Sequence, residues 1–165
     1  MIIKQIVDED VCNYKKTSMV VAFPHCTMKC GDACQNKHLA DDPDIEIEPQ
    51  AIVKRYYKND FSNAMVLQGL EPLDSLNDVM DLITALRDVC SDDIVIYTGY
   101  EEKEFPVESI VSFVKRNGYD NVILKVGRYN PDIEPVYSKE LGIELASGNQ
   151  YAFQINIGNQ THIQE

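Results

Sequence analysis

The segment SMVVAFPHCTMKCGDACQN (residues 18–36) joins a short apolar run to a loop that holds three of the five cysteines. The run Ser18–Phe23 is apolar, contains two β-branched valines and stops at Pro24, which is typical of a buried strand. The cysteines follow this strand at intervals of four residues: Cys26, Cys30 and Cys34. A strand that delivers three thiols to one loop predicts a functional site at the end of that strand.

Three further apolar runs resemble this strand, begin about 28 residues apart and end near glycine: Ala64–Leu67, Ile94–Tyr97 and Val122–Val126. The sequence between them has apolar residues at three- and four-residue spacing, which predicts helices. One helix covers residues 76–86, and another runs from Pro106 in its first turn to Gly118 as its terminator. A shorter helix begins near Pro49.

Strands that alternate with helices predict an α/β fold with a mostly parallel sheet that is buried on both faces. Additional strands are expected at the N-terminus, around Ile2, Ile3 and Ile6, and over Tyr151–Ile157. A complete βα barrel needs about 250 residues. The 165 residues of this chain therefore predict one domain, residues 1–165, built as a partial barrel that is open on one side.

In parallel α/β structures, the functional site lies where the carboxyl ends of the strands meet. Four loops are expected there: the cysteine loop, Gly69–Glu71, Thr98–Gly99 and Gly127–Arg128. We therefore expect these loops to share one rim of the sheet.

The charge, the hydropathy pattern and the cysteine count disfavour several classes of function. The net charge of −12, without a local basic stripe, makes nucleic acid a poor partner. No run is apolar enough to span a bilayer and the first residues lack the pattern of a signal peptide, so a cytoplasmic protein without a membrane partner is expected. An odd number of cysteines, three of them crowded together, favours metal binding or catalysis over a disulfide framework.

Three thiolates can hold an iron–sulfur cluster while one iron keeps no protein ligand. Gly31 gives the loop the backbone freedom to wrap such a cluster. Two alternatives remain open from the residues alone. The cysteines could lie on one face of a helix, or they could bind structural zinc with His25 or His38 as the fourth ligand. Cys12 and Cys90 are interpreted as packing residues.

The segment from Phe23 to Asn36 resembles the cluster loop of radical S-adenosylmethionine enzymes, and more narrowly that of the small activating enzymes of anaerobic (class III) ribonucleotide reductase. The resemblance extends along most of the chain through four co-linear motifs: GLEPL (69–73), IYTGY (96–100), GRY (127–129) and ASGNQ (146–150). The chain departs from the family pattern by one extra residue between Cys30 and Cys34, by Leu70 in place of a glycine, and by Val126 in place of an acidic residue.

The resemblance implies a function for each matching residue. Cys26, Cys30 and Cys34 would ligate three irons of a [4Fe–4S] cluster, and S-adenosylmethionine would chelate the fourth. Glu71 would hold the amino group of this cofactor, with Gly69 allowing close approach. Thr98 and Gly99 would contact its ribose or carboxylate, and Asn36 would help to orient it.

The activity implied is reductive cleavage of S-adenosylmethionine to a 5′-deoxyadenosyl radical, which generates a glycyl radical on the reductase. The implied partners are the anaerobic ribonucleotide reductase and an electron donor such as flavodoxin or ferredoxin. Three alternatives are kept: action on another glycyl-radical enzyme or peptide, a non-enzymatic zinc or iron–sulfur module, and purely structural motif residues. Under the alternative of purely structural motif residues, Glu71 is an exposed acid at the start of a helix, and Thr98–Gly99 is an ordinary turn between a strand and a helix.

Overall fold

The structure is a computed structural model that describes residues 1–28 and 30–158. Its strands are β1 (Ile2–Ile3), β2 (Gln5–Asp10), β3 (Ser18–Phe23), β4 (Ile45–Glu46), β5 (Ala64–Gly69), β6 (Asp93–Tyr97), β7 (Val122–Val126), β8 (Val136–Ser138), β9 (Ile143–Leu145) and β10 (Tyr151–Gln154). Its α-helices are α1 (Lys37–Asp41), α2 (Pro49–Tyr57), α3 (Leu76–Arg87) and α4 (Phe105–Asn117), and two short 3₁₀ helices are η1 (Gly31–Ala33) and η2 (Pro72–Ser75).

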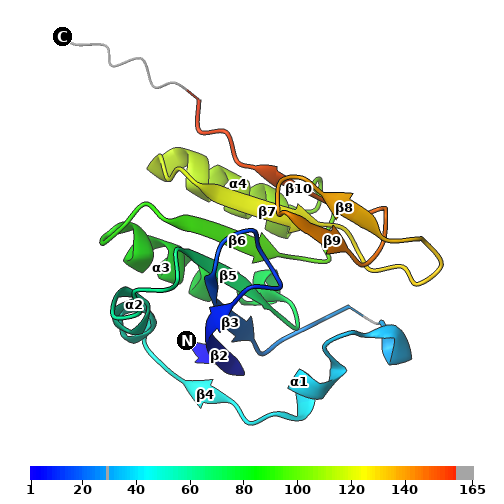
Figure 1. Cartoon of the computed structure of the whole chain (residues 1–165), viewed down its shortest axis with the longest axis horizontal. Coiled ribbons are helices and arrows are strands. Elements are labelled where there is room, and N and C mark those ends of the chain that lie inside the picture. The colour runs from blue at the N-terminus through cyan, green and yellow to red at the C-terminus, as the bar shows by residue number, and fades with distance from the viewer. Residues whose placement is uncertain (29, 159–165) are drawn as a thin grey trace.

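Six strands form the central sheet in the order β10-β7-β6-β5-β3-β2 (Figure 1). The inner four strands, β3, β5, β6 and β7, are mutually parallel, and the edge strands β2 and β10 are antiparallel to their neighbours. Every residue of β3 and of β7 is buried, as expected for strands that are covered on both faces.

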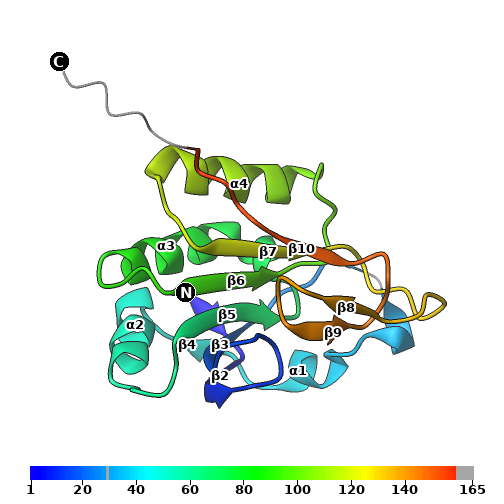
Figure 2. The ribbon, with the colours of Figure 1, turned by 45° about the horizontal axis from the view of Figure 1, so that its top comes forward.

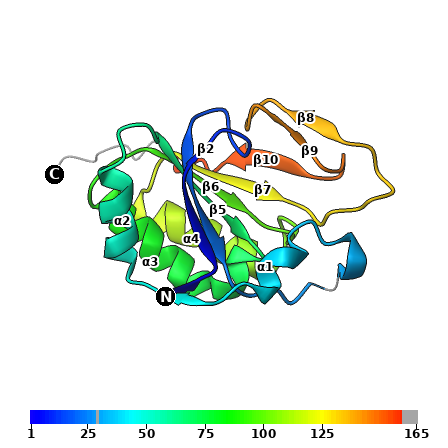
Figure 3. The ribbon, with the colours of Figure 1, turned by 60° about the horizontal axis from the view of Figure 1, so that its bottom comes forward.

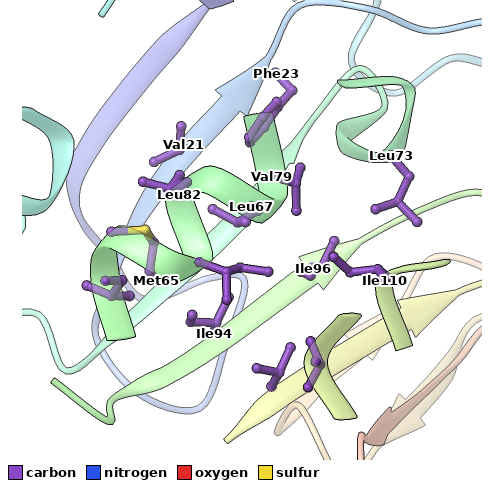
Figure 4. Close-up of a cluster of buried hydrophobic side chains, with 14 of the residues drawn as sticks. Val21, Phe23, Met65, Leu67, Leu73, Val79, Leu82, Ile94, Ile96 and Ile110 are labelled. Carbon is purple, nitrogen blue, oxygen red and sulfur yellow. The ribbon is translucent and has the colours of Figure 1, made fainter. Parts of the chain in front are cut away.

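Helices α2, α3 and α4 cover one face of the sheet (Figure 3). The main hydrophobic core lies between these helices and the sheet, where Met65, Leu67 and Ile96 are fully buried against helix residues such as Leu82 and Ile110 (Figure 4). Strand residues two apart point to the same face. The alternation along each strand therefore sends every second residue into this core.

The opposite face of the sheet carries a smaller apolar cluster. Strand residues such as Val66 and Val95 pack there against Tyr14, Leu141 and Leu145, which belong to the segment before β3 and to the β8–β9 hairpin. Figure 3 shows this hairpin on the side of the sheet away from the helices. This cover lies beside, and does not fill, the carboxyl ends of the parallel strands, where the cavity described below opens.

The four predicted inner strands and the three predicted helices are confirmed. α4 has Pro106 in its first turn and ends at Gly118, whose φ of 65° is the left-handed conformation that favours glycine. α2 begins at Pro49, and the expected C-terminal strand is present as β10. The result is a mixed α/β single domain with a largely parallel central sheet, while closure into a partial barrel remains a prediction.

Some local predictions were wrong. Ile6 lies in the edge strand β2, as expected, but Ile2 and Ile3 form β1, which pairs with β4 outside the main sheet. Several short elements were not expected: the two 3₁₀ helices, α1, β4 and the β8–β9 hairpin. Each of these helices and strands has five residues or fewer, which is too few to show a clear period. In the described part of the chain, no helix is long and apolar enough to cross a lipid bilayer.

Candidate metal and cofactor site

The four loops at the carboxyl ends of the parallel strands line one cavity that is open to solvent. Figure 2 shows β5 and β6 pointing toward the side of the molecule where α1 lies. The wall contains every residue for which a ligand role is expected: Cys26, Cys30, Cys34, Asn36, Gly69, Glu71, Thr98 and Gly99. The strand-end prediction of a common rim is therefore confirmed, while the role of each residue stays a prediction.

The cysteine loop lies at the mouth of this cavity. All five cysteines are free thiols, and Cys26, Cys30 and Cys34 also line a second hollow next to the first. The residues between Cys30 and Cys34 form η1, in which the Ala33 amide donates to the Cys30 carbonyl oxygen at 3.3 Å. The side chain of Asp32 is fully exposed. The residues between Cys30 and Cys34 thus form a turn whose Asp32 side chain faces solvent.

The three thiols share a cavity but do not converge on one point. In the described residues, no group of three His, Cys, Asp or Glu side chains has an arrangement that could hold a metal ion. Desolvation raises the pKa of the Cys26 thiol, the Met28 carbonyl lowers it, and the charges of Glu71, Asp74 and Cys30 raise it further. Thiolates in such surroundings repel one another, so a metal is needed to draw them together and to release their protons.

The donor set nevertheless fits an iron–sulfur cluster. Three thiols on one short loop beside the cavity could hold three irons of such a cluster and would leave its fourth metal corner without a protein donor. A zinc site with a histidine as fourth ligand has less support, because His25 and His38 are both exposed. The interpretation of the cysteines as one face of a helix was wrong, since the described residues between Cys26 and Cys34 form no α-helix and include only the short 3₁₀ helix η1.

The cysteine loop is attached to the sheet at both ends. After Cys34, the Asn36 side-chain amide donates to the Gly69 carbonyl oxygen at 2.9 Å. After Cys26, the Thr27 amide donates to the carboxylate of Asp74, and Tyr100 donates to the same carboxylate at 2.6 Å. These bonds join the loop to the ends of β5 and β6, so they fix where the first and third thiols lie.

Replacing Asp74 by alanine should loosen the start of the cysteine loop. Thr27 and Tyr100 both lose their acceptor, and each such bond contributes about 1.5–3 kcal/mol because the acceptor is charged. We expect hydrogen exchange at the Thr27 amide to accelerate about 10- to 100-fold, with little change in core amides. Asp81→Ala, an exposed site on α3, is the matched control. Equal protection of Thr27 in both variants would show that this attachment is unimportant.

Glu71 is a buried carboxylate on the cavity wall, with 1% of its surface exposed. Its side chain accepts hydrogen bonds from the amides of Leu73 at 3.0 Å and Gly99 at 2.8 Å. Burial raises the pKa of Glu71, and the bonds from Gly99, Thr98 and Leu73 oppose that rise. Glu71 does cap the short helix η2, but the alternative of an exposed acid was wrong. A desolvated carboxylate favours a cationic ligand group.

The structure places three further predicted site residues at the strand ends: Gly69, Thr98 and Gly99. It also shows other reasons why these residue types occur at these positions. A Cβ on Gly69 would collide with the backbone of β3, so this glycine serves strand packing. A Cβ on Gly99 would collide with the thioether of Met28 in the cysteine loop. Thr98 is 2% exposed, and its hydroxyl accepts a hydrogen bond from the Tyr100 amide at 3.1 Å. The Gly99 amide orients Glu71, which is more than an ordinary turn does.

The GRY and ASGNQ motifs contact one another. The Gln150 side chain donates to the Gly127 carbonyl oxygen at 3.1 Å, and Asn149 donates to the Arg128 carbonyl oxygen at 2.7 Å. Arg128 in turn makes a two-fold bond to Glu104, with both distances at 2.8 Å. The turn after β9 thus holds the rim of the cavity in place.

Sequence reasoning missed the polar residues that the strands themselves present to the cavity wall: Gln68, Tyr97 and Lys125. They lie near the ends of β5, β6 and β7, on the face opposite the helices. Lys125 is only 7% exposed, and its ammonium lies 5.8 Å from the centre of the Tyr97 ring. A sequence signal did exist, because Lys125 is a single cation inside the apolar run Val122–Val126.

The ionisation of Lys125 should affect stability. Burial, only partly opposed by Glu71 and Glu101, lowers its pKa to about 8 from the usual 10.5. As the pH rises above 8, Lys125 loses its proton in the folded chain before it does so in the unfolded chain. The free-energy cost of burying the charge is therefore complete below pH 8 and decreases as the pH rises toward 10.5. We expect the unfolding free energy of wild type, relative to Lys125→Met, to rise by about 3 kcal/mol across this window. Denaturant titrations of both proteins at several pH values measure this, and a constant difference would contradict it.

The remaining cysteines lie outside the cavity wall. Cys90 packs against the main core at the end of α3, as expected for a packing residue. Cys12 is exposed, so its interpretation as a packing residue was wrong. Its turn is shaped instead by Asp10, whose carboxylate accepts from the Cys12 and Asn13 amides.

A comparison with protein families supports the metal assignment. Residues 16–131 match the model of a family described as a 4Fe-4S single cluster domain. The matched stretch is more than half of the chain and includes the four parallel strands, the cysteine loop, Glu71 and Lys125. A search among curated proteins gives no match.

Proposed function

This chain belongs to the family of 4Fe-4S single cluster domains, and we propose that it is a radical S-adenosylmethionine enzyme that activates anaerobic ribonucleotide reductase. The observation that supports this most is the composition of a single cavity. Three free thiols, a buried carboxylate and a buried ammonium line the same space at the carboxyl ends of the parallel strands. A module that only stored a cluster would need the thiols but not the buried charges behind them.

The chemistry that the cluster and S-adenosylmethionine supply when bound is one-electron cleavage of the sulfonium, which gives methionine and the 5′-deoxyadenosyl radical that takes hydrogen from a glycine of the reductase. The electron comes from a one-electron donor such as flavodoxin or ferredoxin. In this proposal Cys26, Cys30 and Cys34 hold the cluster.

The residues of the chain position the cofactor and shield it from water. Glu71 accepts hydrogen bonds from the cofactor's ammonium, and the Gly99 and Leu73 amides hold its carboxylate in place on the cavity wall. Asn36 fixes the end of the cysteine loop against β5. The cavity is open to solvent on one side. A loop of the partner protein would enter there, exclude water and bring its glycine to the reactive carbon.

The test is a reaction assay after anaerobic reconstitution with iron and sulfide. We expect a brown protein that, once reduced, converts S-adenosylmethionine to methionine and 5′-deoxyadenosine. Added class III reductase should then show the electron-spin signal of a glycyl radical. A colourless protein with one zinc per chain, or a complete cluster without cleavage, would contradict the enzyme proposal. Cleavage without a radical on this reductase would redirect the proposal to another glycyl-radical enzyme or a peptide.

Glu71→Gln should weaken cofactor binding while leaving the cluster intact. The substitution removes the negative charge but keeps the size and one acceptor oxygen of the side chain. Because a hydrogen bond to a charged group contributes about 1.5–3 kcal/mol, we expect S-adenosylmethionine to bind about 10- to 100-fold more weakly. Equilibrium binding to the reconstituted protein measures this. Unchanged affinity would show that Glu71 serves only to accept hydrogen bonds from the Leu73 and Gly99 amides.

A further inference from the structure

Lys125 is a buried cation that the described side chains do not neutralise. It is 7% exposed and lines the cavity. Within residues 1–28 and 30–158 it forms no ion pair, and its ammonium donates one hydrogen bond, to the Gly127 carbonyl oxygen at 3.3 Å. An ammonium can donate three such bonds. A buried charge with this little compensation is costly, so it needs another explanation than stability.

The cavity also contains the opposite charge. Glu71 is 1% exposed and influences Lys125 electrostatically, yet the two side chains are not paired with each other among the described contacts. Glu71 is instead directed by the Gly99 amide, and Lys125 by the Gly127 carbonyl and the Tyr97 ring. Two buried, opposite and separated charges in one cavity match a ligand that carries both signs. An α-amino acid head group, with an ammonium and a carboxylate on one carbon, has this property.

We propose that Lys125 binds the carboxylate of an α-amino-acid head group whose ammonium is bound by Glu71. This rests on the proposed function, in which the head group is the methionine end of S-adenosylmethionine. Lys125 donates its two free hydrogen-bond positions to the carboxylate and keeps its bond to Gly127. The site therefore selects S-adenosylmethionine over analogues that lack the carboxylate, and Lys125 is a specificity-determining residue.

The experiment compares two ligands on two proteins. Binding of S-adenosylmethionine and of decarboxylated S-adenosylmethionine is measured anaerobically on reconstituted wild type and Lys125→Met. Methionine fills the same space without a charge. We expect Lys125→Met to bind S-adenosylmethionine about 10- to 100-fold more weakly and the decarboxylated analogue with nearly unchanged affinity. The ratio of the affinity for S-adenosylmethionine to the affinity for the decarboxylated analogue should fall by that same factor. This comparison cancels any contact that the carboxylate makes elsewhere.

The controls separate this inference from a structural role and from the proposed function. Iron content in Lys125→Met should match wild type, and its melting temperature below pH 8 should be higher than that of wild type because the cost of the buried charge is removed. Lys54→Met on the exposed face of α2 should bind both ligands as wild type does. If Lys125→Met loses its cluster, Lys125→Gln serves for the same comparison. An equal loss of affinity for both ligands, or no loss, overturns the carboxylate assignment alone. Wild type that binds neither ligand overturns the proposed function as well.

Discussion

Cys34→Ala should lose the iron–sulfur cluster after anaerobic reconstitution. In the proposed site each thiolate of the loop ligates a different iron, so no other residue can replace the missing sulfur. We expect iron to fall from about four per chain to a small residual amount, together with the brown absorbance. Cleavage of S-adenosylmethionine should fall below detection. Iron and sulfide analysis with the visible spectrum measures the effect.

Cys90→Ala is the matched control for this experiment. Cys90 is also a free thiol, but it packs against the core at the end of α3 and does not line the cavity. This variant should keep its full iron content and lose only the small stability that a packed sulfur provides. Similar iron contents in the two variants, whether high or low, would refute the assignment of the cysteine loop as the metal site.

Gly69→Ala should cause a large loss of stability. Gly69 has a φ of 112°, which L-residues rarely adopt, and an added Cβ would meet the backbone of Phe23 and Ala22 in the neighbouring strand. Backbone atoms of a buried sheet cannot move aside. Strain and overpacking together should lower the free energy of unfolding by about 3 kcal/mol or more. The expected fall in melting temperature is roughly 6–12 °C for a chain of this size.

Gly118→Ala provides the comparison at a glycine without a steric conflict. Gly118 also has a positive φ, of 65°, but no atom lies near the position of an added Cβ. Only the conformational cost of about 1 kcal/mol is expected at this helix end. Equal melting temperatures for the two variants would show that the contact between β3 and β5 does not require glycine.

The sequence predicted the parallel core well, and the reason is physical. β3, β5, β6 and β7 are buried on both faces, so each appears as a short apolar run between helices with clear periodicity. Strands of this kind bring their carboxyl ends to one edge. The common cavity of the cysteine loop, Glu71 and Thr98 therefore followed from strand order alone.

Long-range side-chain contacts could not be predicted in the same way. Thr27 and Asp74 are 47 residues apart, and Asp74 and Tyr100 are 26 apart, yet one carboxylate joins them. No period or motif links three such residues. The β8–β9 hairpin was also missed, because its strands have three residues each and present few apolar side chains to the sheet.

Lys125 shows a different limit of prediction from the sequence. The sequence contained the signal, a lysine within Val122–Val126, but the apolar run alone determined the strand prediction. Only the structure shows that this lysine points to the face without helices, beside Tyr97 and within the cavity. A charged residue inside a predicted buried strand should therefore be considered for a role in binding.

The most direct test of the account is the electron-spin spectrum of the reduced cluster with and without S-adenosylmethionine. If three cysteines hold the cluster at the mouth of the cavity, one iron is open to the cofactor, and adding it should change the spectrum. The same addition should leave the spectrum of the oxidised, spin-paired cluster silent. A reduced cluster whose spectrum does not respond to saturating S-adenosylmethionine would contradict the central claim of an open iron in this cavity.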